Sequence, residues 1–125
     1  MKEAQLIAAG IVKDVLEGNN LNKVFQKYSK ENKINPKDLS QIKDLVFGTL
    51  RSYGKTKFVI NKLVKRPPSN FIISILLHVA LFQLITNRSN SYTVVNQAVS
   101  ASNSVNNRYT SFTNGVLRTF LREKI

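Results

Sequence analysis

Cysteine is absent from this chain of 125 residues, and acidic residues are almost absent from its second half. Without cysteine there is no disulfide, no thiolate nucleophile and no zinc or iron–sulfur site with thiolate ligands. Between Asp44 and Glu123 there is neither Asp nor Glu, so most general acid–base and divalent-metal chemistry lacks its carboxylates there. These absences favour a binding protein over an enzyme, and the missing cysteine fits a cytoplasmic location.

Basic residues are concentrated in the part of the chain that lacks acids. Residues 1–50 carry eight bases and six acids, whereas residues 51–125 carry eleven bases and one acid, and the formal net charge is +12 at pH 7. The positive electrostatic field of such an excess of bases attracts polyanions and speeds their binding. Because 42% of the residues are hydrophobic, a folded domain and not a disordered tail carries this charge. The sequence therefore predicts a single folded domain that binds a phosphate backbone.

Helical periodicity runs along nearly the whole chain, and strand signals are missing. We expect an all-α bundle of six to seven helices with short connections. The number of helices depends on residues 36–66, because Gly48 and Gly54 make either a bend or a break in this stretch possible. The run Phe71–Ile85 is apolar on nearly every side but shorter than the about 20 residues of a membrane span, so we expect it to be the buried central helix and expect no membrane contact.

Several helix ends can be placed from single residues. Gly18 suits a left-handed C-terminal cap, and Asn20 suits an N-cap. Asn35 followed by Pro36 is a strong helix start. The two prolines after Arg66 should end the helix that precedes them. Two further helices are expected at 91–105 and from about residue 111.

A basic stripe follows if residues 51–66 form one continuous helix. Five bases then fall within an arc of about 100°: Arg51, Lys55, Lys62, Lys65 and Arg66. Phe58 points into the same arc, as a ring that stacks on a nucleic-acid base would. For Phe58 alone, packing against a neighbouring helix is the stronger expectation. For the stripe as a set we expect phosphate binding, because an ordinary solvent face mixes both signs of charge.

The last helix repeats this pattern with Arg118 and Arg122, four residues apart and opposite its apolar side. Cations near a helix C-terminus also complement the helix dipole, which explains Arg122 better than Arg118. His78 is the only histidine and lies in an apolar run, so we expect a core residue with its polar atoms satisfied. No second metal ligand, catalytic triad or glycine-rich phosphate loop accompanies it.

Four short motifs occur in order: FGTLR at 47–51, LFQL at 81–84, VNQAV at 95–99 and NGVLR at 114–118. In this order and spacing they resemble the NusB family of helical RNA-binding domains. They are most similar to the N-terminal domain of bacterial cytosine-C5 methyltransferases of small-subunit ribosomal RNA, the RsmB, Sun or Fmu group. Departures from the family pattern are Gln97 in place of Glu and Ser91 in place of Pro. Asn96 and Asn114 match family positions, where we expect them to satisfy backbone groups inside the bundle.

The resemblance implies two packed helical subdomains and a noncatalytic RNA-binding module. We expect residues 1–125 to be one such domain, a fragment of a longer rRNA methyltransferase that uses this domain to recognise small-subunit rRNA. Those enzymes use catalytic cysteines and a glycine-rich loop for S-adenosylmethionine, and this sequence has neither. The cofactor is therefore expected only in a missing C-terminal domain. The alternative is a free-standing NusB-type antitermination factor that binds RNA and NusE, the ribosomal protein of the Nus complex.

Overall fold

The computed structural model describes residues 3–123 and places most of them in helices, which confirms the all-α prediction. No strand occurs within these residues. In chain order the elements are α1 (Ala4–Leu16), α2 (Leu21–Glu31), α3 (Pro36–Arg51), α4 (Tyr53–Leu63), α5 (Phe71–Ile85), α6 (Ser91–Val105), the 3-10 turn η1 (Asn107–Tyr109) and α7 (Thr110–Glu123).

The helix ends confirm the capping predictions. Gly18, just after α1, has a φ of +102°, which favours glycine. The side chain of Asn20 accepts a hydrogen bond from the backbone of Lys23 at 3.1 Å, and Asn35 caps α3 in the same way. Asn90 caps α6 by accepting from two backbone amides at 2.9 and 3.3 Å. This cap holds the turn before α6, whose first residue is Ser91.

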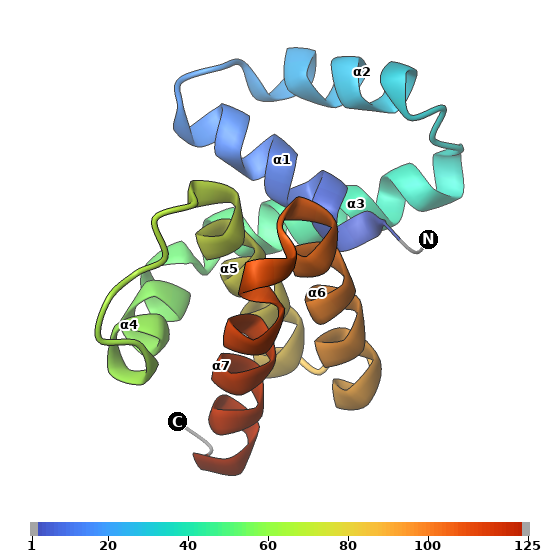
Figure 1. Cartoon of the computed structure of the whole chain (residues 1–125). Coiled ribbons are helices and arrows are strands. Elements are labelled where there is room, and N and C mark those ends of the chain that lie inside the picture. Colours follow the sequence, from blue (N-terminus) through green and yellow to red (C-terminus); the bar gives the residue numbers. More distant parts are fainter. Residues whose placement is uncertain (1–2, 124–125) are drawn as a thin grey trace.

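Helix α5 is the centre of the molecule and serves two hydrophobic cores. One side of α5, including Ile73 and Val79, packs with α1, α2 and α3. The other side, including Leu77 and Leu81, packs with α4, α6 and α7. Figure 1 shows α1 and α2 at the top of the view, with α4, α6 and α7 around α5 in the lower part. The two packed subdomains and the buried Phe71–Ile85 helix are thus confirmed. No helix within residues 3–123 is long and apolar enough to cross a membrane.

Buried polar groups cross-link the packed helices. The side chain of Gln5 in α1 donates to that of Gln83 in α5 at 2.9 Å and to the carbonyl of Val94 in α6 at 3.2 Å. The hydroxyls of Ser102 and Thr113 lie 2.7 Å apart and join α6 to α7. Buried polar groups need such partners because an unpaired one is costly.

Residues 51–66 do not form the one continuous helix on which the predicted basic stripe was based; of the bend or break left open there, the structure has a break. Ser52 separates α3 from α4, and α4 ends at Leu63. Val64 is extended, with φ −127° and ψ 124°, and it packs against the second core. Arg66 precedes a proline, which disfavours the helical conformation. The break lets α3 pack in the first core while α4 packs in the second.

Candidate nucleic-acid interface

Helix α4 is anchored to α5 through its buried side. Thr56, Val59 and Ile60 are buried, and the Thr56 hydroxyl is hydrogen-bonded to Nδ1 of His78. The ring of Tyr53 stacks on the His78 imidazole, with centroids 4.0 Å apart and planes 9° from parallel. Anchored in this way, α4 presents a defined face to solvent.

His78 is a core residue, as expected, and its environment keeps it neutral. Its side chain is 3% exposed. Burial, followed by the positive charge of Lys57, lowers the pKa of His78 to about 4. A neutral imidazole held by Thr56 serves as an anchor for α4. Within residues 3–123 no group of three His, Asp or Glu side chains could hold a metal ion.

The outward face of α4 carries Lys55, Phe58 and Lys62, which fall within an arc of about 60° on the helix. The ammonium of Lys62 lies 4.7 Å from the centroid of the Phe58 ring. Phe58 is 60% exposed, so the expectation that it packs against a neighbouring helix was wrong. The buried side of α4 lies on the opposite side of the helix, and the ring therefore has no core to reach.

The other predicted bases surround α4. Arg51 is the last residue of α3, whereas Lys65 and Arg66 lie in the segment that follows α4; all three are exposed. The stripe is therefore assembled from three consecutive segments and not from one helix face. Lys65 also lines a shallow hollow of about 360 Å³ whose other walls include Gly115 and Thr119 of α7.

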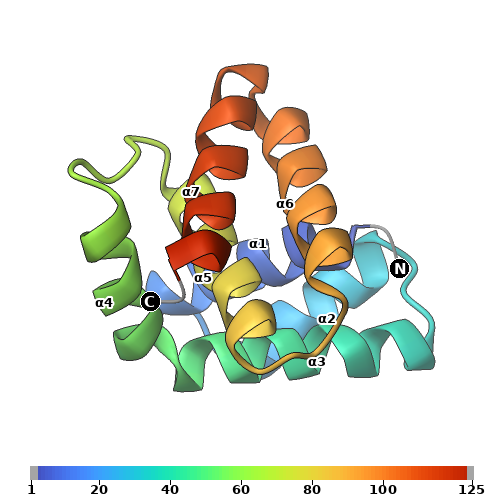
Figure 2. The ribbon, with the colours of Figure 1, turned by 90° about the horizontal axis from the view of Figure 1, so that it is seen from below.

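Helix α7 lies beside α4 (Figures 1 and 2) and carries the remaining two predicted bases, Arg118 and Arg122, both exposed. Nε of Arg118 donates to the side-chain oxygen of Asn114 at 2.9 Å. Asn114 therefore orients an arginine, and Asn96 is exposed. Neither asparagine satisfies the backbone inside the bundle as predicted, because neither faces the core.

Most of these bases have no acidic partner. Residues 3–123 contain three ion pairs: Lys13–Glu17, Arg88–Asp44 and Arg122–Glu123. Among the seven predicted bases, only Arg122 has a carboxylate within 4 Å in the described part of the chain, with its Nε 3.8 Å from Glu123. We call the exposed surface formed by these seven residues the basic face; its members are Arg51, Lys55, Lys62, Lys65, Arg66, Arg118 and Arg122.

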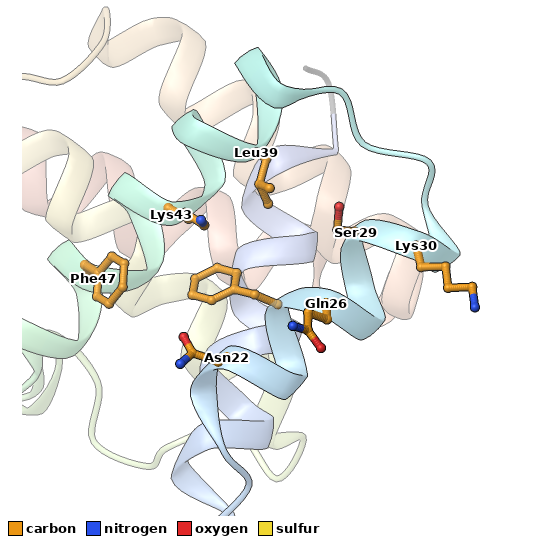
Figure 3. A pocket seen from close by; sticks show the side chains of 8 residues that line it. Asn22, Gln26, Ser29, Lys30, Leu39, Lys43 and Phe47 are labelled. Atoms are coloured by element: carbon orange, nitrogen blue, oxygen red, sulfur yellow. The ribbon is translucent and has the colours of Figure 1, made fainter.

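A second feature, which the sequence did not reveal, is a groove between α2 and α3 (Figure 3). It has a volume of about 530 Å³. The rings of Phe25 and Phe47 meet there with centroids 5.8 Å apart, and the ammonium of Lys43 lies 5.6 Å from the Phe25 ring. The spacing of Lys43 and Phe47 places them on one side of α3, but only the packing of α2 on α3 creates the hollow.

The sequence matches the NusB family over residues 2–122. The chain belongs to the NusB family. Three similar proteins are each named ribosomal RNA small subunit methyltransferase B. The one from Pasteurella multocida is 30% identical over 122 residues, covering 94% of this chain and 27% of that protein. Those from Cronobacter sakazakii and Klebsiella pneumoniae are 30% and 29% identical, each covering 94% of this chain and 28% of the relative.

This NusB-family chain thus spans less than a third of the length of the relatives that it matches. S-adenosylmethionine is a nucleoside cofactor. Within residues 3–123 no strand leads through a glycine-rich loop into a helix, which is how such nucleoside cofactors are commonly held. The glycines of this part of the chain lie singly in helices or, in the case of Gly18, in a turn.

Proposed function

We propose that this NusB-family chain is a noncatalytic RNA-binding domain, and that it is the rRNA-recognition domain of a small-subunit rRNA cytosine-C5 methyltransferase. The basic face carries the proposal of RNA binding. It gathers seven exposed bases on α4, its flanking segments and the neighbouring α7, in a part of the chain with no acid between Asp44 and Glu123. The name that the relatives share, ribosomal RNA small subunit methyltransferase B, supports ribosomal RNA as the target.

The basic face would bind RNA mainly through its phosphates. Lysine offers a point charge on a flexible stem, whereas arginine offers a planar fork that matches phosphate oxygens. Arg118 is already oriented by Asn114, and α4 is held in place by the Thr56–His78 anchor. Phosphate contacts position a protein on RNA but carry no direct base information. The basic face would therefore supply affinity and orientation, and little sequence preference.

The chemistry of methyl transfer would reside in residues that this chain does not contain. S-adenosylmethionine supplies the methyl group in such enzymes, and under this proposal it binds outside the present domain. We expect calorimetry to detect no binding of S-adenosylmethionine to this chain; micromolar binding would contradict the proposal. A cytoplasmic location, and a ribosomal or Nus-complex protein as a further partner, belong to the same proposal.

The proposal is tested by reversing two charges on the basic face, Lys62→Glu with Lys65→Glu. If about five phosphates are neutralised, log affinity for single-stranded RNA should fall against log salt with a slope near −3.5, at about −0.7 per phosphate. The double variant should lower the affinity and bring the slope to about −2. Both side chains are exposed, so the thermal midpoint should barely change.

The matched control is Lys23→Glu with Lys27→Glu, which makes the same change in net charge on the exposed side of α2. It should leave the salt slope close to that of the unchanged protein. A folded Lys62/Lys65 variant that keeps its affinity and slope for small-subunit rRNA fragments would show that the basic face is not the RNA-binding surface.

A further inference from the structure

Phe58 is an exposed aromatic ring between Lys55 and Lys62 on the outward side of α4. Its side chain is 60% exposed, and the other large exposed apolar side chains are Leu16, Phe47, Phe71 and Tyr92. Phe58 has a base on the same helix face on both sides, at Lys55 and Lys62. Phe47 is flanked in the same way on α3, but its ring already packs against Phe25. The packing of the protein does not account for this ring.

The position of Phe58 is fixed by the helix that carries it. On α4, Phe58 is turned about 100° from Val59 and about 160° from Ile60, which are both buried in the second core. Rotating α4 to bury Phe58 would break the Thr56–His78 hydrogen bond. The ring is therefore held outward by the anchor on the other side of the same helix.

We propose that Phe58 stacks on an unpaired base, so that the basic face selects single-stranded RNA over duplex. This inference rests on the proposed function and names its substrate class. Single-stranded nucleic acids bind where an aromatic ring takes the base and a positive groove follows the backbone. In a duplex the bases are already stacked on one another and cannot reach the ring.

The two flanking lysines fit this arrangement. Lys55 and Lys62 lie about 10 Å apart along the axis of α4, on either side of the ring, so their long side chains can reach the phosphates on both sides of one stacked nucleotide. The ammonium of Lys62, now 4.7 Å from the ring centroid, would exchange this cation–π contact for a phosphate. The acid-free surroundings disfavour a basic or neutral protein segment as the occupant.

The groove between α2 and α3 is a weaker candidate for the base. The ring of Phe47 already packs against Phe25, and neighbouring Asp44 and Glu31 place carboxylates on the same two helices. Phe58 has neither an aromatic partner nor a carboxylate on its own helix. Phe47 therefore serves as a comparison in the test.

The sharpest experiment uses the absence of tryptophan from the chain. Phe58→Trp introduces a single indole whose emission reports on that position, and a stacked base quenches it. The probe is oligouridylate of about 12 nucleotides, within the range that single-strand-binding domains cover, compared with its duplex with oligoadenylate. We expect quenching by the single strand only. Tyr92→Trp, on the exposed side of α6, should not be quenched by either.

Affinity measurements test the same inference without a reporter. Phe58→Ala should weaken single-strand binding about 5- to 150-fold, the effect of losing one stacked base. It should leave the salt slope and the duplex affinity unchanged, since no charge is removed. Phe58→Tyr, which keeps a ring, should restore binding, and Tyr92→Ala should have no effect.

The outcomes separate this inference from the proposed function. If the unchanged protein binds RNA with the expected salt slope but Phe58→Ala has no effect, stacking is wrong and phosphate binding stands. If RNA binds without changing the emission of the Phe58→Trp variant, residue 58 does not contact the RNA and the inference fails. The exposed ring would then be available to bind a protein partner. Loss of affinity with Phe47→Ala instead would place the base in the groove. Absence of any RNA binding would overturn both proposals.

Discussion

Gly48 tests how closely α3 packs against α5. It is buried in α3, and a Cβ at this position would overlap the ring of Phe82, meeting three of its carbon atoms. Phe82 is 2% exposed, so its ring is enclosed by the first core. We therefore expect Gly48→Ala to destabilise the protein, although alanine is the better helix former.

The magnitude follows from two opposing effects. Overpacking a core costs about 1–3 kcal/mol, occasionally more, and replacing glycine by alanine inside a helix contributes about 0.5–1 kcal/mol in the other direction. The obstacle is an enclosed aromatic ring and not the end of a flexible side chain. The cost of overpacking should therefore be at the upper end of its range. We expect the free energy of unfolding, measured in urea, to fall by about 2 kcal/mol.

Gly115→Ala is the matched control. Gly115 lies inside α7 with nothing within 4 Å of the position of a Cβ, so this change should stabilise the protein by about 0.5–1 kcal/mol. In a Phe82→Leu background, Gly48→Ala should cost about 1 kcal/mol less, since contacting residues are coupled. If Gly48→Ala stabilised the protein as Gly115→Ala does, the close approach of α3 and α5 would be refuted.

Three further measurements follow from the structure. The pKa of His78 is lowered to about 4, so the unfolded chain binds its proton more readily between pH 6.5 and pH 4. The free energy of unfolding should then be about 2 kcal/mol lower at pH 5 than at pH 7.5, and His78→Gln should remove that part of the pH dependence; an unchanged dependence would contradict it. Gln5→Leu should lower the free energy of unfolding by about 1–3 kcal/mol, because it leaves Gln83 unpaired. The double variant Gln5→Leu with Gln83→Leu should recover most of this loss. Equal losses in the single and the double variant would exclude coupling between the two side chains. Amide hydrogen exchange should be slowest in α5, because opening it disrupts both cores; fast exchange across Leu76–Leu81 with the rest protected would show the reverse.

Local sequence features predicted the helices well. The limits of α5 and α6 follow from a continuous apolar run and from the polar turns around it. The caps at Asn20 and Asn35 depend on neighbouring backbone amides alone, so they could be placed without knowledge of the fold. His78 as a core residue followed from its apolar neighbours, although its partner Thr56, 22 residues away in the sequence, did not.

What the sequence did not predict depends on packing between distant segments. The break at Ser52 arises because α3 and α4 serve different cores, which the apolar pattern does not reveal. The exposure of Phe58 follows from the anchor on the other side of α4. The angular position of Phe58 did place it among the bases, but the usual burial of aromatic rings outweighed this observation. The groove beside Phe47 required the position of α2 on α3.

The use of one helix by both cores has a consequence for synthesis of the protein on the ribosome. The α1–α3 half cannot close its core until α5 has been made, and the opposite side of α5 then waits for α6 and α7. Residues 86–123 take about 2–8 s to add at about 5–20 residues per second. Once α5 has emerged from the ribosome and until α6 and α7 follow, the nascent chain presents Leu77, Leu81 and Leu84 without their partners. We expect chaperones to engage the nascent chain at this stage, and translational pauses at this stage to favour aggregation.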